Sequence, residues 1–213
     1  MPSDPVFIAF QLAILTLSIV IHEVAHGYAA NMLGDPTARL SGRLTLNPIP
    51  HIDLVGSILV PAFLVVTNAG LLFGWAKPVP YNPYNLRNKR WGEAIVAFAG
   101  PGTNLLIAII FGLIARFGVG QLPDAFINIS VIASFVNLFL GLFNLIPLPP
   151  LDGYTTLRGL LPYQAGMALR DFENRIRGGG IASLILILVV FSVFFAGPFS
   201  LLVSYIFTLL IGS

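Results

Sequence analysis

The chain has no cysteine among its 213 residues, and only 9% of its residues are charged. The absence of cysteine excludes disulfides, thiolate zinc ligands and cysteine nucleophiles, so any metal site must use histidine, aspartate or glutamate. A soluble domain carries about a quarter of its residues as Asp, Glu, Lys or Arg. The scarcity of charge, with a mean hydropathy of +0.88, therefore predicts an integral membrane protein. The formal net charge of +2 is too small to indicate a nucleic-acid partner, and we expect none.

Long apolar runs dominate the chain, and a helix needs about 20 apolar residues to cross the hydrocarbon core. Five segments stand out: Val6 to Met32, Leu54 to Phe73, Ala94 to Phe117, Phe126 to Ile146, and Ile181 to Ile211. No basic residue precedes the first segment, so we expect a retained helix and not a cleaved signal peptide. Gly197-Pro198 interrupts the last segment, which is therefore one kinked helix or two shorter helices. The predicted fold class is an all-α membrane protein, a multi-pass helical bundle.

Three polar stretches between these segments have recognisable patterns. Residues 38–47 alternate polar and apolar side chains, which predicts a short strand. Residues 74–90 contain three prolines at spacings that exclude a helix, which favours an extended, proline-protected edge. Residues 163–177 have an apolar and a charged helical face and end before glycines, which is typical of a helix lying in the membrane interface.

The strongest chemical signal is the motif His22-Glu23-Val24-Ala25-His26, in the second half of the first apolar segment. At 3.6 residues per turn, His22 and His26 project from one helix face, and Glu23 lies close enough to reach a shared ligand. A charged group near the middle of a membrane helix costs about 2.5–3.5 kcal/mol, so three clustered ionisable groups indicate a function. Two imidazoles can then bind Zn²⁺ while the carboxylate transfers a proton.

A catalytic zinc normally has three protein ligands and one water, so a third donor is required. The candidates in apolar surroundings are His51, Asp53 and Asp152. Prolines end the fourth segment before Asp152, and Gly153 allows a tight turn that aims the carboxylate back into the protein; the alternative is a helix-end carboxylate facing water. His51 and Asp53 precede an apolar segment, so we expect a solvated interfacial role, or an N-cap role for Asp53, rather than ligation.

The motif HEVAH at 22–26, together with NLIPLPPLDG at 144–153, resembles the site-2 protease family of intramembrane zinc metalloproteases. GPGTN at 100–104 is similar to the family's Gly-Pro-x-x-Asn helix start, and GWAKPVPYNP at 74–83 is a further likeness. The resemblance implies that His22, His26 and Asp152 bind one zinc per chain and that Glu23 is the catalytic base.

The resemblance also sets the expected domain organisation. No polar segment is long enough for a PDZ-like or CBS-like domain, so we expect a minimal member of the family. Residues 1–213 would form a single integral-membrane protease domain, with a catalytic core over about 6–153 and interfacial and transmembrane helices over about 162–213. The expected partners are a transmembrane protein substrate and the lipid bilayer, while the oligomeric state is not readable.

Two further roles concern the reaction itself. Asn104 or Asn144 could donate an amide N–H to the developing oxyanion, and for each a structural role of bridging helices by hydrogen bonds is equally open. A transmembrane substrate must unwind locally before attack, and the predicted strand at 38–47 could accept the unwound segment as an added strand.

The ligand set constrains the topology. If all five segments crossed the membrane, His26 and Asp152 would approach opposite faces, so we expect one intervening segment not to cross. Leu54 to Phe73 is the weakest span because it contains Gly and Pro, and it is predicted to be re-entrant. Ten basic residues then lie on the catalytic side with Arg116 alone opposite, against eight and three if all five cross. The positive-inside rule thus places the active site toward the cytoplasmic side of the cell membrane.

Readings from other classes remain open. A membrane metal-ion transporter could use intramembrane His and Asp, but it has no need of Glu23 beside a ligand, so Glu23→Gln would spare transport and abolish proteolysis. A non-catalytic zinc-binding protein would tolerate that substitution in every assay. An aspartyl protease using Asp53 and Asp152 would leave the histidines unexplained.

Overall fold

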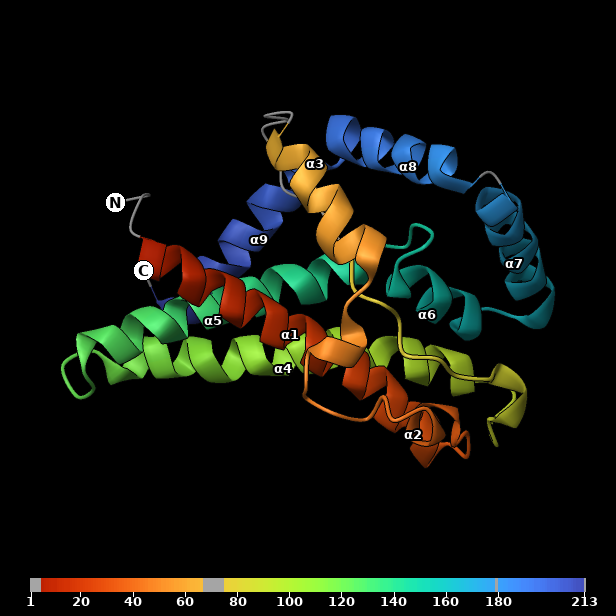
Figure 1. The fold of residues 1–213 in the computed structure, drawn as a ribbon, viewed down its shortest axis with the longest axis horizontal. Coiled ribbons are helices and arrows are strands. Elements are labelled where there is room, and N and C mark those ends of the chain that lie inside the picture. Colours follow the sequence, from red (N-terminus) through yellow and green to blue (C-terminus); the bar gives the residue numbers. More distant parts are fainter. Residues whose placement is uncertain (1–4, 67–74, 179, 213) are drawn as a thin grey trace.

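The computed structural model describes residues 5–66, 75–178 and 180–212. Within these ranges the chain folds into helices joined by loops (Figure 1). Three of the described helices are long and apolar enough to cross a membrane, namely α1 (Pro5–Met32), from Phe7 on, α4 (Gly92–Gly118) and α5 (Asp124–Asn144). The predicted multi-pass helical membrane protein is therefore confirmed.

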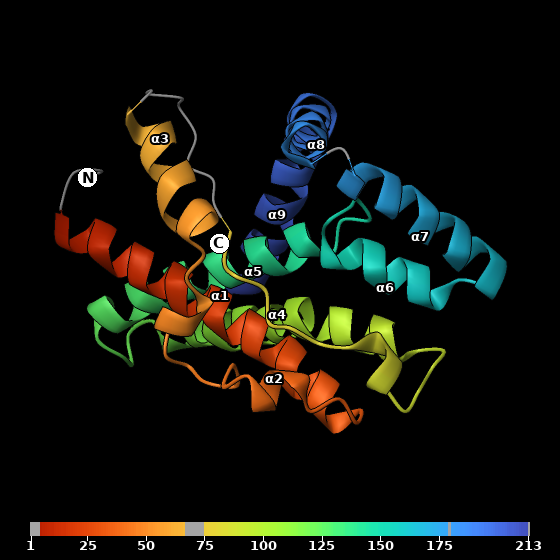
Figure 2. The same cartoon turned by 45° about the vertical axis from the view of Figure 1, so that its right-hand side comes forward.

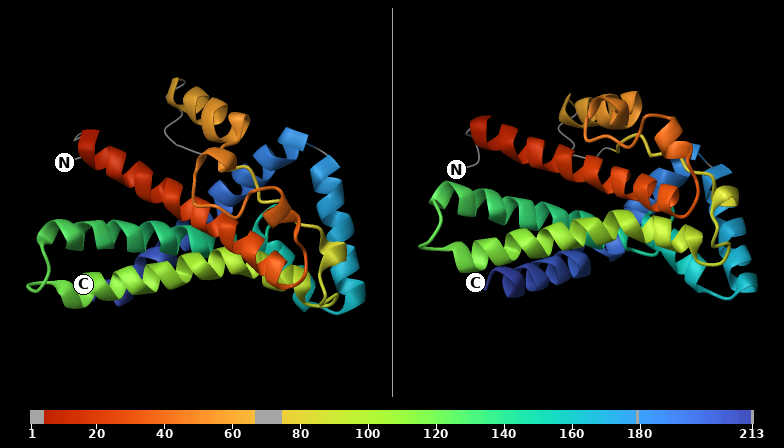
Figure 3. Two further views of the ribbon diagram at one scale, coloured as in Figure 1. Left: turned by 60° about the horizontal axis from the view of Figure 1, so that its bottom comes forward. Right: turned by 90° about the horizontal axis from the view of Figure 1, so that it is seen from below.

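The three spanning helices form one bundle. Helices α4 and α5 lie side by side in opposite directions, and α1 crosses them (Figure 3). Many of the buried positions of α4 and α5 hold glycine, alanine or serine, small residues that let membrane helices approach closely. One such contact is a hydrogen bond of 2.9 Å from the Ser134 hydroxyl to the Ala108 carbonyl. Helices α1 and α4 run in opposite directions, so the C-terminal end of α1 and the N-terminal end of α4 lie at the same end of the bundle (Figure 1).

The strand predicted for residues 38–47 is wrong, because the described part of the chain contains no strand. The segment begins with the short helix α2 (Thr37–Leu40) and then turns at Gly42, whose φ is +66°. The Arg43 N–H bonds back to the Ala38 carbonyl at 3.0 Å. Local hydrogen bonds therefore take the place of a strand partner.

The second apolar segment is short where it is described. A 3₁₀-helix, η1 (Ile49–His51), precedes a six-residue π-helix, η2 (Leu54–Leu59), and the seven-residue α3 (Val60–Val66); residues 67–73 lie outside the described residues. The Asp53 carboxylate accepts a hydrogen bond of 2.7 Å from the Gly56 N–H, which confirms its predicted N-cap role. This part of the segment is shorter than the about 20 residues a span needs. The described residues show neither a crossing nor a re-entrant loop.

The remaining polar region lies at the end of the bundle where α1 ends and α4 begins (Figure 1). No helix forms from Trp75 to Asn82, as the prolines predict, and a single 3₁₀-helix, η3 (Pro83–Asn85), precedes α4.

The C-terminal part consists of α6 (Asp152–Leu160), α7 (Tyr163–Gly178), α8 (Gly180–Phe194) and α9 (Ala196–Ile211). The predicted helix at 163–177 is confirmed as α7. A break at Phe195 divides the last apolar segment, so it is two shorter helices and not one kinked helix. Helix α9 packs against α4 and α5, while α8 rises away from the bundle (Figure 2).

Candidate metal centre

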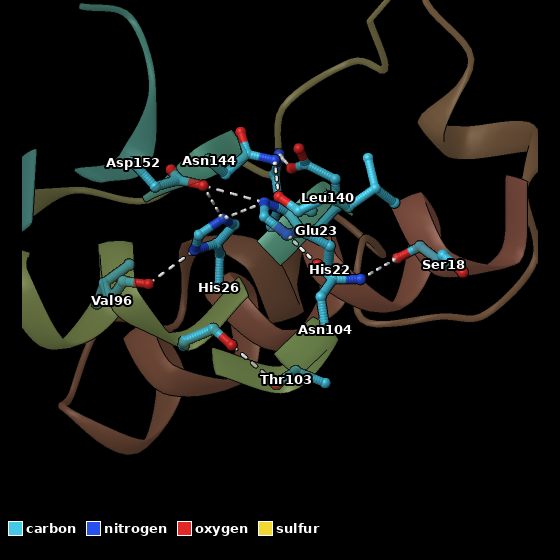
Figure 4. Close-up of polar contacts among 12 residues, drawn as sticks. Ser18, His22, Glu23, His26, Val96, Thr103, Asn104, Leu140, Asn144 and Asp152 are labelled. Atoms are coloured by element: carbon cyan, nitrogen blue, oxygen red, sulfur yellow. Dashed lines mark hydrogen bonds and ion pairs between the residues drawn. The ribbon is translucent and has the colours of Figure 1, made fainter. Parts of the chain in front are cut away.

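Three side chains from two distant parts of the sequence converge (Figure 4), near the end of the bundle where α1 ends and α4 begins. His22 Nε2 lies 3.0 Å from His26 Nε2 and 3.0 Å from Asp152 Oδ2, and His26 Nε2 lies 3.3 Å from the same carboxylate oxygen. His22 and His26 come from α1, one turn apart, and Asp152 is the first residue of α6. Among the described residues, this is the group of His, Asp and Glu side chains placed to share a metal ion.

The donor set fits zinc. Zinc bonds of about 2.0–2.2 Å in a tetrahedral site put neighbouring ligand atoms about 3.3 Å apart, close to the three separations observed here. The space beside the imidazoles depends on Gly100 in α4. A Cβ atom at that position would lie 2.4 Å from His26 Nε2 and 2.7 Å from His22 Nε2. A bare backbone at Gly100 therefore keeps the space next to the ligand atoms free of side chain.

Hydrogen bonds fix the proton on each imidazole. His22 Nδ1 lies 2.6 Å from the side-chain oxygen of Asn104, and His26 Nδ1 lies 2.7 Å from the carbonyl oxygen of Val96. Both partners can only accept, so each Nδ1 carries the hydrogen. The Nε2 lone pairs of both rings are then directed at the shared position, which is the arrangement a metal-binding histidine requires.

The loop between α5 and α6 places Asp152. Gly153 is required there by close approach, because a Cβ atom would lie 2.1 Å from the Leu145 carbonyl oxygen. The glycine thus packs the first turn of α6 onto the end of α5, which differs from the tight turn predicted. Asp152 Oδ2 thereby lies within 3.3 Å of both Nε2 atoms. An ionised carboxylate at this position is the third donor that a catalytic zinc requires.

Glu23 lies next to His22 on α1 and is half-buried. Its Oε2 accepts a hydrogen bond of 2.8 Å from the backbone N–H of Val79. Val79 belongs to the extended segment from Trp75 to Asn82. Two hydrogen bonds hold that segment in place. The Lys77 N–H donates to the His51 carbonyl at 2.8 Å, and the Arg43 guanidinium donates to the Lys77 carbonyl at 2.7 Å. Sequence reasoning missed this contact, since a backbone donor leaves no signal in residue types.

The two asparagines singled out in the sequence occupy different positions. Asn104 is fully buried, and besides accepting from His22 it directs its amide N–H groups at Asn137 Oδ1 (2.7 Å) and the Ser18 carbonyl (3.4 Å). These contacts link α4 to α1 and α5, which favours the bridging role over an oxyanion donor. Asn144, the last residue of α5, donates to the Leu140 carbonyl at 3.0 Å. Asn137 was overlooked, although a polar residue inside an apolar span is a recognisable signal.

The two remaining candidates, His51 and Asp53, lie outside the group of His22, His26 and Asp152 that could hold a metal ion. Asp53 caps η2 as described above. His51 is 2% exposed, and its Nε2 lies 3.0 Å from the Thr45 carbonyl, so the predicted solvated role of His51 is wrong. The ring is buried beneath the loop that follows α2, and it supports that loop instead of facing water.

Several known proteins are similar to this chain in sequence. The model of "Peptidase family M50" matches residues 113–187. The Bacillus subtilis protein "Putative zinc metalloprotease YwhC" is 43% identical over 160 residues, which cover 70% of this chain and 67% of that protein. The chain belongs to peptidase family M50. This M50 chain is also 25% identical over 205 residues, 95% of its length, to the Methanocaldococcus jannaschii protein "Zinc metalloprotease MJ0392", of which it covers 48%. No solved structure matches it.

A further M50 relative, the Mycobacterium tuberculosis protein "Putative zinc metalloprotease Rip3", is 38% identical over 103 residues, 48% of this chain and 26% of that protein. The chain thus spans two thirds or less of these relatives. Membership confirms the predicted site-2 protease family and its activity class, an intramembrane zinc metalloprotease. The His-His-Asp group is consistent with zinc as the metal.

Proposed function

We propose that this M50 protease hydrolyses peptide bonds within or next to the transmembrane segments of membrane-protein substrates. In this proposal His22, His26 and Asp152 hold one zinc per chain, and Glu23 is the general base. The observation that carries it is the convergence of the three donor atoms within 3.3 Å of one another, beside a glutamate on the same helix.

Bound to these ligands, zinc would supply a Lewis acid that polarises the peptide carbonyl and makes water more acidic. Glu23 takes a proton from the attacking water and returns it to the leaving amine nitrogen. Asn144 uses one amide N–H on the Leu140 carbonyl, and its second N–H is a candidate donor to the developing oxyanion. Asn104 acts on the reaction through His22, because both its amide hydrogens and its oxygen have protein partners.

The active site is proposed to face the cytoplasm. α1 and α4 run in opposite directions, so the connection between them begins and ends at the same end of the bundle, which is the end that holds the proposed metal site (Figure 1). This connection contains Arg39, Arg87 and Arg90, which are all exposed, whereas Arg116 lies near the opposite end of α4. The positive-inside rule then puts the site end in the cytoplasm. Single cysteines at positions 45 and 85 should both react from the cytoplasmic side only.

The test uses the purified protein in detergent, with metal analysis and cleavage of a model membrane peptide. Glu23→Gln should keep the zinc and lose cleavage, because the ligands remain and the base is removed. Asp152→Asn should lose both zinc and cleavage. A wild type that binds no zinc, or a Glu23→Gln variant that still cleaves, would contradict the proposal. We propose that residues 1–213 form a single integral-membrane protease domain, so the assay uses all of them together.

A further inference from the structure

A line of buried polar side chains leads from His22 into the bundle. Asn104 on α4 accepts from His22 and donates to Asn137 Oδ1 on α5 at 2.7 Å. Asn137 in turn donates to the Ser18 hydroxyl of α1 and to the Ala133 carbonyl, both at 2.9 Å. The exposed fractions of Ser18, Asn104 and Asn137 are 4%, 0% and 2%. This relay of Asn104, Asn137 and Ser18 therefore connects all three spanning helices at membrane depth.

An asparagine amide has two ends of nearly equal size but opposite hydrogen-bonding character, since the oxygen accepts and the nitrogen donates. Its orientation is therefore decided by its neighbours. The Ala133 carbonyl belongs to the backbone of α5 and can only accept, so it requires the nitrogen of Asn137. The oxygen of Asn137 then faces Asn104 and requires the nitrogen of Asn104. The oxygen of Asn104 is left for His22.

A reversal of the Asn104 amide would be unfavourable at three contacts. It would set the Asn104 oxygen against the Asn137 oxygen and against the Ser18 carbonyl. It would also turn a donor toward His22 Nδ1, which favours the tautomer with its hydrogen on Nε2. That tautomer has no lone pair on the atom that faces His26 and Asp152. Buried polar groups gain their full effect only when every member has a partner, so the relay acts as a unit.

We propose that Asn137 is a positioning residue for the zinc site, which fixes the Asn104 amide and thereby holds His22 in its metal-binding tautomer. His26 needs no such relay, because a backbone carbonyl, that of Val96, fixes it directly. Asn137 does not touch the metal ligands itself; its effect reaches the zinc through Asn104 and then His22. The inference rests on the proposed zinc ligation and adds the device that prepares one ligand.

The experiment measures zinc affinity of the purified full chain by competition with a chromogenic chelator. Asn137→Ala should weaken zinc binding about tenfold, the lower end of the effect of residues that support metal ligands. ¹⁵N NMR of the histidine-labelled, zinc-free protein should then show the Nε2–H tautomer of His22, which is absent from the wild type. The matched control is Ser134→Ala, which removes another buried hydrogen bond between α5 and α4 without a link to His22. Its zinc affinity and tautomer should equal those of the wild type.

Each outcome decides the proposal. Wild-type affinity and a wild-type tautomer in Asn137→Ala would overturn it, and so would equal losses in Asn137→Ala and Ser134→Ala, which would make general bundle packing the cause. If Asn137→Ala does not fold, Ser18→Ala carries the test, since it removes one acceptor of the relay and should weaken zinc binding severalfold. A wild type without zinc affinity would instead contradict the proposed function, so the two failures are distinguishable.

Discussion

The backbone N–H of Val79 donates a hydrogen bond of 2.8 Å to the carboxylate of Glu23. Val79 stands between Pro78 and Pro80, neither of which has an N–H to donate. The Val79 N–H is therefore the only backbone donor among these three residues, and it is bound to Glu23, the proposed general base. The Val79 side chain is buried and lies over Gly27, where a Cβ atom would come within 2.9 Å of it. Glu23 is thus held by a chain segment outside its own helix.

Replacing Val79 by proline should lower cleavage about tenfold to a hundredfold while leaving zinc content intact. A hydrogen bond to a charged group contributes about 1.5–3 kcal/mol, and proline removes the donor while accepting an extended backbone. The assay is kcat/KM on a model membrane peptide, alongside metal analysis of the same samples.

The matched control is Val79→Ala, which keeps the N–H and shortens the buried side chain that lies beside Gly27. We expect this variant to cleave within a few fold of the wild type. If Val79→Pro cleaves as fast as Val79→Ala, the hydrogen bond to Glu23 has no part in the reaction.

Gly100→Ala should abolish zinc binding without unfolding the protein. Its Cβ would lie 2.4 Å from His26 Nε2 and 2.7 Å from His22 Nε2, so one ring must leave the shared position. Alanine is otherwise favourable in a helix interior, by about 1 kcal/mol over glycine. The measurements are zinc content and the unfolding temperature of the zinc-free protein.

Gly102→Ala provides the comparison within the same helix. Its Cβ would meet the Phe98 ring, at 3.0 Å for the nearest atom, and no metal ligand within 4 Å is among its three nearest contacts. This variant should bind zinc normally. Normal zinc binding by Gly100→Ala would show that the close approach of α4 to the imidazoles is not required.

The three proposed metal ligands could be selected from the sequence because their chemistry is local or unusual. His22 and His26 share a helix face at any regular helical geometry, and a carboxylate such as Asp152 after a run of prolines is conspicuous in an apolar chain. The supporting contacts were not predictable. Val79 acts through its backbone, and the partners of Asn137 depend on how α1, α4 and α5 pack.

The errors have a common physical origin. The period-two pattern at 38–47 predicts a strand only if a partner strand exists, and the chain instead satisfies its backbone locally through the turn at Gly42. His51 precedes an apolar segment, which suggested exposure. In the structure the Lys77 N–H donates to the His51 carbonyl, and the Thr45 carbonyl lies 3.0 Å from Nε2 of its ring, so the residue is buried. In both cases hydrogen bonds to backbone groups, which the pattern of residue types does not reveal, decide the structure.

Arg158→Ala should destabilise the protein and weaken zinc binding together. Arg158 of α6 contacts Glu93 of α4 and donates to Glu173 of α7 at 2.5 Å, while Arg170 of α7 donates to Glu93 at 2.6 Å. Removing one partner from a largely buried ion network costs about 3–5 kcal/mol. Zinc binding should also weaken, because Arg158 lies on α6 and the first residue of that helix is the proposed ligand Asp152. The measurements are the unfolding temperature with and without zinc, and zinc affinity.

Arg175→Ala is the control for this network, since Arg175 is an exposed arginine of α7. Its unfolding temperature should stay close to that of the wild type. Should Arg158→Ala lower the unfolding temperature yet bind zinc normally, the network would stabilise the bundle without positioning Asp152.

Asp35 should make the stability of the protein depend on acid pH. Its buried carboxylate accepts from the Asn82 N–H (2.6 Å), the Thr37 hydroxyl (2.6 Å) and the Asn85 amide (2.8 Å), which ties the end of α1 to the loop before α4. Burial raises the pKa of Asp35, but these hydrogen bonds lower it more, so the folded pKa lies below its ordinary value. The stabilisation is therefore complete above about pH 4 and is lost as the pH falls through the folded pKa.

Asp35→Asn should accordingly be less stable than the wild type at pH 7, by about 1.5–3 kcal/mol for hydrogen bonds to a charged group. The difference in unfolding temperature should shrink as the pH is lowered from 5 toward 3, because only the wild type loses a charge at this position. Asp171→Asn, on the exposed face of α7, should instead follow the wild type at every pH. A difference between Asp35→Asn and the wild type that stays constant over this range would mean that the shape of the side chain, and not its charge, holds the two loops together.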